Sequence, residues 1–247
     1  MVATKGAATV SVCLPARDEA ATVGPIVAAI VSELVERQPL VDEVVVVDDG
    51  SADATARVAG EAGARVVSHP EPLGKGGALQ TSLAASSGEL VVWCDADLVA
   101  FDPIFVTGLL EPLLASPVVA FTKACYRRDL EGRAGEGGRV TELVARPLVA
   151  RFFPHLRGFT QPLAGEYAGR RHVLEKLDLA PGYGVDLGVL IDVAELVGVE
   201  AMVQVDLGRR RHRNRPLADL APHAEAVLAV ALDRAGLGPA PGPEGPR

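Results

Sequence analysis

The sequence predicts an α/β fold with a mostly parallel, Rossmann-like sheet flanked by helices. Short β-branched runs alternate with segments whose apolar residues recur at helical spacing, which is typical of βαβ units. The four valines in the run EVVVV, residues 43–47, point to both faces of a strand, as expected where helices cover the sheet on either side. The chain has 247 residues, of which 49% are hydrophobic, so one domain can bury a sizeable core.

The first half is expected to contain four strands with helices between them. The first strand ends at Pro15, and the second helix begins at Ser51, a capping residue, and ends at Gly63. The expected strands are residues 9–14, 43–47, 64–67 and 90–94, and the expected helices are residues 20–38, 51–63 and 76–87. Ligands of such sheets bind beyond the carboxyl ends of the strands, so functional residues are expected there.

The second half follows a less regular pattern. Its expected helices are residues 103–114, 139–153, 185–197 and 217–235, and its expected strands are residues 118–126 and 201–207. Residues 130–138 form a Gly-rich segment that we predict to be a mobile loop. Residues 236–247 are rich in Pro and Gly and are predicted to be a frayed tail.

Charge and cysteine content exclude several classes of protein. The net charge of −8 argues against a general binder of nucleic acid or of anionic membranes. The chain has no apolar run near the roughly 18 residues that a membrane-spanning helix needs, and no leader-like start. Cys13, Cys94 and Cys125 are far apart and form no metal-binding spacing, so we expect reduced thiols and a cytoplasmic protein.

Acidic residues follow three of the predicted strands. They are Asp18 and Glu19 after the first strand, Asp48 and Asp49 after the second, and Asp95 and Asp97 after the fourth. A single acidic strand end is often only a turn or a helix cap. Because neighbouring parallel strands end at the same edge of the sheet, three such ends together predict a functional site.

Asp95 and Asp97 are separated by one residue directly after an apolar strand, so both carboxylates can face one divalent ion. Oxygen ligands suit Mg²⁺ or Mn²⁺, and such an ion keeps waters and accepts phosphate oxygens from a substrate. Lys75 lies in a glycine-rich GKGG segment, where it can face a phosphate or a sugar hydroxyl. The spacing is not that of a P-loop, and the usual dinucleotide fingerprint is missing after the first strand.

Two segments of the second half are candidates for binding anions. Gly138, Arg139 and Thr141 open a predicted helix, where free backbone N–H groups attract a phosphate, although an ordinary loop and cap would have the same pattern. Residues 209–215 (RRRHRNR) form a basic stretch that is either a solvated turn or a local anion site. A nucleic-acid patch is disfavoured because no aromatic residue is interleaved. Within this stretch, His212 is either an ordinary histidine or a metal ligand.

Four segments in the first half resemble the GT-A nucleotide-sugar glycosyltransferases. They are LPARDEA, VVDDGSADAT, GKGGAL and VVWCDADL, in this order. Four later segments, GRVTELVARP, QPLAGEYA, APGYG and LGRRRHRNRP, are similar to the glucosyl-3-phosphoglycerate synthase family. The resemblance covers residues 9–237 and implies a GT-A fold with a C-terminal acceptor-binding extension. It also implies a metal-dependent, retaining transfer of glucose from UDP-glucose to 3-phosphoglycerate by a homodimer, with Mg²⁺ or Mn²⁺ as cofactor.

The resemblance also implies roles for individual residues. Donor contacts would fall to Pro15, Ala16, Arg17, Glu19, Asp49, Lys75, Asp95, Ala96, Tyr183 and Arg210. Acceptor contacts would fall to Gly138, Arg139, Thr141 and Asn214. The metal would be held by Asp97 and His212, and the catalytic residues would be Lys75, Asp97 and Asp186. Asp186 stands where the family usually has Glu, and Asp49 stands where Ser is common.

The same resemblance divides the single domain into functional parts. Residues 1–98 are predicted to be the donor-binding half, residues 99–236 the acceptor-binding half, and residues 237–247 a flexible tail. For retention of configuration we favour front-face attack by the acceptor over a covalent glycosyl-enzyme. The Asp186 side chain reaches less far than the Glu usual in the family, so it is expected to orient the glucose hydroxyls and not to attack the anomeric carbon.

Other functions stay open at this point. One is a related glycosyltransferase with GDP-mannose or GDP-glucose as donor, or with another acceptor such as a polyprenyl phosphate. Another is a nucleotide-sugar binding protein without activity. The presence of Lys75, Asp95, Asp97 and His212 favours an enzyme.

Overall fold

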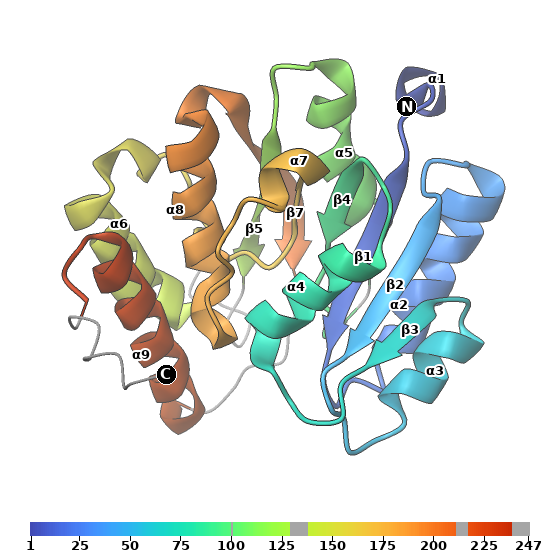
Figure 1. Ribbon diagram of the computed structural model, residues 1–247, viewed down its shortest axis with the longest axis horizontal. Helices are drawn as coiled ribbons and strands as arrows, with labels where there is room; N and C mark the ends of the chain where they lie inside the picture. Colours follow the sequence, from blue (N-terminus) through green and yellow to red (C-terminus); the bar gives the residue numbers. More distant parts are fainter. Residues whose placement is uncertain (100, 129–137, 211–216, 239–247) are drawn as a thin grey trace, which may run out of the picture.

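The computed structural model describes residues 1–99, 101–128, 138–210 and 217–238, and they form a sheet with helices on both of its faces (Figure 1). Within these ranges the sheet has seven strands in the order β3-β2-β1-β4-β6-β5-β7. The strands are β1 (Val10–Ala16), β2 (Glu43–Asp48), β3 (Arg65–Ser68), β4 (Leu90–Trp93), β5 (Phe121–Arg128), β6 (Tyr167–Arg170) and β7 (Met202–Arg210). The predicted α/β fold is confirmed.

The strands of the first half are parallel, as predicted, and β1 lies between β2 and β4. β5 and β7 are also parallel to each other. β6 lies between β4 and β5 and is antiparallel to both. The sequence analysis missed β6, because four residues that include Gly169 carry no strand pattern and their extended conformation depends on the two neighbouring strands.

The predicted helices are all found, with differences at their ends. The helices are α1 (Val2–Lys5), α2 (Val23–Ile30), α3 (Thr55–Glu61), α4 (Gly74–Ala85), α5 (Ile104–Ala115), α6 (Arg146–Phe152), α7 (Arg171–Leu174), α8 (Val185–Val197) and α9 (Leu217–Arg234). Wider π-helical turns continue α2 through Val31–Arg37 and precede α6 over Thr141–Ala145. The predicted loop at 130–138 and the predicted tail at 237–247 lie almost entirely outside the described residues.

Helix α3 begins at Thr55 and not at Ser51, because the residues before it hold the loop that follows β1. The hydroxyl of Ser51 accepts a hydrogen bond from the backbone N–H of Asp18 at 2.9 Å. The N–H of Ala52 donates to the Asp18 carboxylate at 2.8 Å, and the N–H of Glu19 donates to the Thr55 hydroxyl at 2.8 Å. These bonds join the loops after β1 and β2 into one surface at the edge of the sheet.

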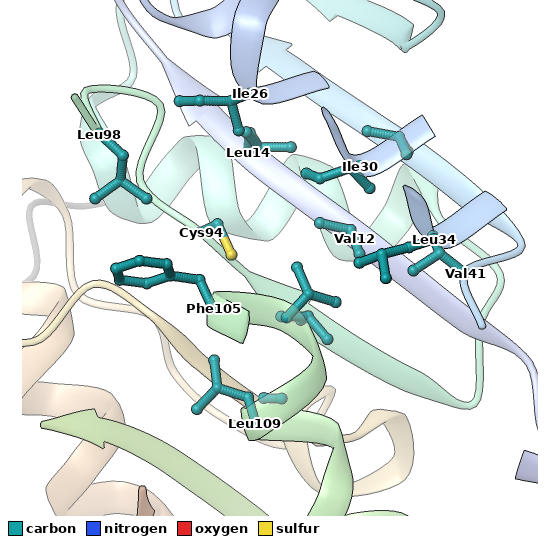
Figure 2. Packing of buried hydrophobic residues seen from close by; sticks show 14 of the residues in the cluster. Val12, Leu14, Ile26, Ile30, Leu34, Val41, Cys94, Leu98, Phe105 and Leu109 are labelled. Atoms are coloured by element: carbon teal, nitrogen blue, oxygen red, sulfur yellow. The ribbon is translucent and has the colours of Figure 1, made fainter. Parts of the chain in front are cut away.

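The core has one layer on each face of the sheet. On one face, Val12 and Leu14 of β1 pack with Ile26 and Ile30 of α2, and Phe105 of α5 extends the same layer (Figure 2). The other face packs against α4, α6, α8 and α9. The carboxyl ends of β1, β2 and β4 are therefore held between two packed layers, which gives a rigid base for a site.

The thiols agree with the expectation from the sequence. Cys13 and Cys94 are buried, Cys125 is half-buried, and none forms a disulfide. Burial raises the pKa of the Cys13 thiol to about 11. Among the described residues, no helix combines the length and the apolar character that crossing a membrane requires.

Candidate functional site

A cavity of about 330 Å³ opens where β1, β2 and β4 end. Its walls contain most of the residues that the sequence singled out, and these are Pro15, Ala16, Arg17, Glu19, Asp49, Lys75, Asp95, Ala96, Asp97, Gly138, Arg139, Thr141, Tyr183 and Asp186. His212 and Asn214 lie outside the described residues, and the side chain of Arg210 is not described. The predicted convergence of three acidic strand ends is confirmed, because β2, β1 and β4 are neighbours in the sheet.

Lys75 lies between two carboxylates inside this cavity. Its ammonium nitrogen is 2.8 Å from Oδ1 of Asp95, which follows β4, and 2.8 Å from Oδ2 of Asp186, in the first turn of α8. The Lys75 side chain is 14% exposed, and that of Asp186 is 9% exposed. Burial opposes the charge of Lys75, but the two carboxylates outweigh it and raise the pKa of Lys75 well above its usual value.

Helix α4 carries Lys75 in its first turn, two residues earlier than the sequence pattern placed the helix start. Asp49 explains this difference, because its carboxylate accepts hydrogen bonds from the N–H groups of Leu73 at 2.7 Å and of Gly74 at 2.9 Å. These bonds satisfy donors that a helix start leaves unpaired. The same turn requires a glycine at position 76. A Cβ at Gly76 would overlap the backbone carbonyl of Ala180, which crosses this turn.

His69 supports the same helix start, and the sequence analysis missed it. Its Nδ1 lies 2.8 Å from Oδ1 of Asp49, and its Nε2 lies 2.8 Å from the hydroxyl of Thr81 in α4. Asp49 therefore lines the cavity while its carboxylate holds the loop before Lys75. Its predicted contact with the donor stays a prediction.

Two buried side chains behind Asp186 were also missed. The hydroxyl of Tyr167 in β6 donates to Oδ1 of Asp186 at 3.2 Å. The ammonium group of Lys123 in β5 donates to the backbone carbonyl of Asp186 at 3.2 Å. The signal in the sequence was weak, because Lys123 is a single charge in the apolar run of residues 118–126 and Tyr167 belongs to the strand that the pattern did not reveal.

Helix α9 closes the cavity on the side away from β1. Leu220, His223 and Val227 line it, and the ring of His223 lies over that of Tyr183 with centroids 3.7 Å apart. The sequence predicts α9 but not its place, since no local pattern records which strand or loop a distant helix covers.

Gly138, Arg139 and Thr141 line the cavity at the start of a helical segment, as predicted. The N–H of Glu142 donates to the carbonyl of Gly138 at 3.0 Å, so the helical turns begin there. Thr141 is 1% exposed. A helix start, a guanidinium group and a hydroxyl on one wall can bind the phosphate of a small molecule.

Asp95 and Asp97 fit a hard divalent ion, because both line the cavity and both offer carboxylate oxygens. In the described parts of the chain, no group of three or more His, Cys, Asp or Glu side chains could hold a metal ion. Two carboxylates nevertheless suit an ion that keeps waters and takes phosphate oxygens from its substrate. The predicted ligand His212 cannot be placed, since it lies outside the described residues.

Two walls of the cavity thus differ in chemistry. One wall offers carboxylates at strand ends and a lysine at the start of α4, which suits a metal-bound diphosphate and a sugar. The other offers a helix start and Arg139, which suits a second anion. Such a cavity can bring two phosphate-bearing molecules together.

Comparisons with known proteins agree with this chemistry. Residues 11–172 match the model of the family described as glycosyl transferase family 2. The chain is 48% identical to the glucosyl-3-phosphoglycerate synthase of Mycolicibacterium paratuberculosis, and the match covers 95% of this chain and 75% of that protein.

Solved structures give the same result. The structure is similar to that of glucosyl-3-phosphoglycerate synthase from Mycobacterium tuberculosis in complex with Mn²⁺, UDP-glucose and phosphoglyceric acid, with a TM-score of 0.88. The identity is 46%, and the match covers 96% of this chain and 83% of that chain. The structure of that enzyme with Mg²⁺ and UDP matches equally well, with a TM-score of 0.88 and 46% identity over the same shares of the two chains.

Proposed function

Because this chain belongs to glycosyltransferase family 2 and, within it, to the glucosyl-3-phosphoglycerate synthases, we propose that its cavity transfers glucose from UDP-glucose to 3-phosphoglycerate. The chain is therefore an enzyme, with Mg²⁺ or Mn²⁺ as its cofactor. The observation that carries the proposal is the ion pair of Lys75 with both Asp95 and Asp186. It joins the end of β4, where a metal-bound diphosphate would lie, to the start of α8, where the sugar would lie.

On the donor side, the end of β1 and the loop that follows it bind the uridine part of UDP-glucose, through Pro15, Ala16, Arg17 and Glu19. Asp97 would hold the metal ion with Asp95 beside it. When bound, this ion offsets the negative charge that develops on the leaving diphosphate. Lys75 brings a fixed positive charge to the same place, and its buried position makes that charge more effective than it would be in water.

Asp186 orients the glucose ring through its hydroxyl groups. Its carboxylate is held from two sides, by Lys75 at 2.8 Å and by the Tyr167 hydroxyl at 3.2 Å. A side chain held in this way keeps one rotamer, and positioning of the reacting groups is a large part of catalysis. Tyr183 completes this part of the cavity.

On the acceptor side, Gly138, Arg139 and Thr141 bind the phosphate of 3-phosphoglycerate, and Asn214 is predicted to contact the same molecule. This arrangement leaves the single free hydroxyl of 3-phosphoglycerate to face the anomeric carbon of glucose. The phosphate contact is supported by the helix start at Gly138 and by the buried Thr141.

The transfer proceeds with retention by front-face attack. The acceptor hydroxyl oxygen bonds to the anomeric carbon on the face from which UDP departs, the bond from that carbon to the diphosphate oxygen breaks, and the departing phosphate takes the hydroxyl proton. Asp186 supports this route, because it is anchored to Lys75 and Tyr167 and is not aimed as a nucleophile.

The reaction is tested with the purified protein, UDP-glucose, 3-phosphoglycerate and Mg²⁺ or Mn²⁺, with the product read by mass spectrometry. We expect glucosyl-3-phosphoglycerate and UDP, loss of both with EDTA, and recovery when metal is returned. GDP-glucose, GDP-mannose and glycerate serve as competing substrates. Preference for a GDP-sugar, or equal use of glycerate, would contradict the assigned substrates, and UDP-glucose binding without turnover would indicate a binding protein.

Three further parts of the proposal concern the whole protein. A cytoplasmic location is supported by the three cysteines without disulfides. Division into a donor half, residues 1–98, and an acceptor half, residues 99–236, is supported by the two walls of the cavity. A homodimer is the predicted assembly, and light scattering of the purified protein tests it.

A further inference from the structure

Lys123 is a lysine with no exposed surface, and it does not line the cavity. Its side chain starts from β5 and runs beneath the ring of Tyr167, with its nitrogen 4.5 Å from the ring centroid. The ammonium group donates hydrogen bonds to two backbone carbonyls, that of Ala164 at 2.9 Å and that of Asp186 at 3.2 Å. Its two partners are 22 residues apart in sequence, so one side chain joins two separate segments.

Both segments contribute directly to the cavity. Ala164 lies between Leu163, which lines the cavity, and Gly165. A Cβ at Gly165 would overlap the carboxylate oxygens of Asp95, so this turn packs directly against that carboxylate. Asp186 is the other carboxylate that pairs with Lys75. Of the two segments that Lys123 joins, one therefore packs against the Asp95 carboxylate and the other carries the Asp186 carboxylate.

We propose that Lys123 is a positioning residue for glucosyl transfer, which ties the turn at 163–165 to the start of α8 and so holds Asp95 and Asp186 at the spacing that Lys75 bridges. This inference rests on the proposed function. Lys123 is not a catalytic residue, because it lies behind the cavity wall and acts through the backbone of residues that face the substrates.

The energetics of the amine support a role beyond packing. Burial lowers the pKa of Lys123 to about 8, although the nearby Asp186 favours its charged form. An unbranched apolar side chain would fill the same space without this desolvation cost. What the amine adds is two directed hydrogen bonds to carbonyls that would otherwise be buried without this donor.

The test replaces Lys123 with methionine, which keeps the length and removes the donors. Thr122→Val is the matched control, because Thr122 lies in the same strand and is equally buried. Its hydroxyl also donates to a backbone carbonyl, that of Leu109 in α5 at 2.8 Å, but this bond lies away from the cavity. For both variants we would measure kcat, the KM for UDP-glucose, the affinity for UDP with Mn²⁺ by calorimetry, and the melting temperature.

For K123M we expect kcat to fall roughly 10- to 100-fold, because small displacements of positioned groups have effects of this size. The affinity for UDP with Mn²⁺ should stay within about threefold, since neither Asp97, the predicted metal ligand, nor the predicted uridine contacts at residues 15–19 are among the groups that face Lys123. T122V should lose a similar part of its thermal stability and keep its kcat within about twofold. K123Q, which keeps an uncharged donor, should fall between the wild type and K123M.

Two results would overturn the inference. One is a kcat of K123M within twofold of the wild type. The other is a parallel loss of UDP affinity and kcat in K123M and K123Q, which would indicate general damage to the fold. If K123M does not accumulate as folded protein, K123Q decides between the same outcomes. A wild-type enzyme without glucosyl transfer would instead contradict the proposed function, so the two failures are distinguishable.

Discussion

The two walls of the cavity are built in different ways. The donor wall consists of the loops after β1, β2 and β4, three neighbouring parallel strands of the first 98 residues. The acceptor wall is assembled from a helix start at Gly138, the turn at 163–165 and one face of α9, and the start of α8 joins it to the donor wall. These segments are widely separated in sequence, and the turn at 163–165 leads into β6, which is inserted antiparallel between β4 and β5.

The difference lies in the kind of interaction that brings the residues of each wall together. Parallel strand ends always meet at one edge of the sheet, so the donor wall follows from the repeated βαβ pattern. The junction of this wall with the acceptor wall depends on individual long-range contacts, such as those of Lys123 and Tyr167 with Asp186. We therefore expect substitutions on the two walls to separate donor binding from acceptor binding.

The largest effect is expected for Lys75→Met, because Lys75 belongs to both walls. The change leaves Asp95 and Asp186 facing each other without the cation, in a cavity that must also accept a diphosphate. Loss of one fixed charge at a transition state lowers kcat by roughly 10²–10³-fold. Steady-state kinetics with both substrates saturating measure this effect.

The exposed Lys176→Met is the matched control for this change and should leave kcat within about twofold. A Lys75→Met enzyme with near-normal kcat would contradict the idea that this residue joins the two walls.

Arg139→Ala should separate the walls by their Michaelis constants. We expect the KM for 3-phosphoglycerate to rise about 10- to 100-fold, because a hydrogen bond to a charged group contributes about 1.5–3 kcal/mol. The KM for UDP-glucose should change by less than about threefold. Arg151→Ala, on the exposed side of α6, is the control. Equal increases in both KM values would mean that the walls do not bind separately.

Asp186→Asn tests the junction of the walls with a smaller effect. The amide keeps the size of the side chain and loses the charge that pairs with Lys75, so kcat should fall about tenfold. The product should keep its α linkage, which proton NMR of the anomeric position records. Asp192→Asn is the control, because Asp192 lies on the same helix as Asp186 and its ion pair is with Arg234 of α9. A β-linked product, or a glucosyl ester on Asp186, would contradict front-face attack.

The smallest effect concerns the pH dependence of stability. Burial lowers the pKa of Lys123 from its ordinary value of 10.5, which applies to the unfolded chain, to about 8 in the folded protein. Above pH 8 the unfolded chain therefore binds more protons at this residue than the folded protein does. The free energy of unfolding of the wild type should therefore rise relative to K123M, by about 1 kcal/mol between pH 8 and pH 9. Below pH 8 both states hold the proton and the difference should be constant.

Urea unfolding of both proteins from pH 7 to pH 9.5 measures this difference. The groups that face Lys123 are present in both proteins and largely cancel, and they are Lys75, Asp95, Glu166, Tyr167 and Asp186. A difference that stays flat over this range would mean that the Lys123 amine is not held in a dry environment.

The sequence by itself determined the parallel half of the sheet and the composition of the donor wall. Alternating strands and helices form a parallel sheet, and the carboxyl ends of its neighbouring strands lie at one edge. The carboxylates that follow three of these strands are therefore placed together by the pattern alone. Helix α8 was predicted with its exact bounds, since its apolar pattern and the glycines on either side are local signals. Gly138, Arg139 and Thr141 were also found, because a glycine before a helical pattern is a local signal too.

Only the tertiary structure decided which distant segments complete the site. Tyr167 lies in a strand that exists because β4 and β5 pair with it, and four residues carry no pattern for this. Nothing in the sequence distinguishes Lys123 from other lysines, because its role depends on two carbonyl partners that only the structure shows. The start of α4 at Gly74 depends on Asp49, 25 residues earlier. In each case the deciding interaction joins residues far apart in the chain, and local patterns do not record such interactions.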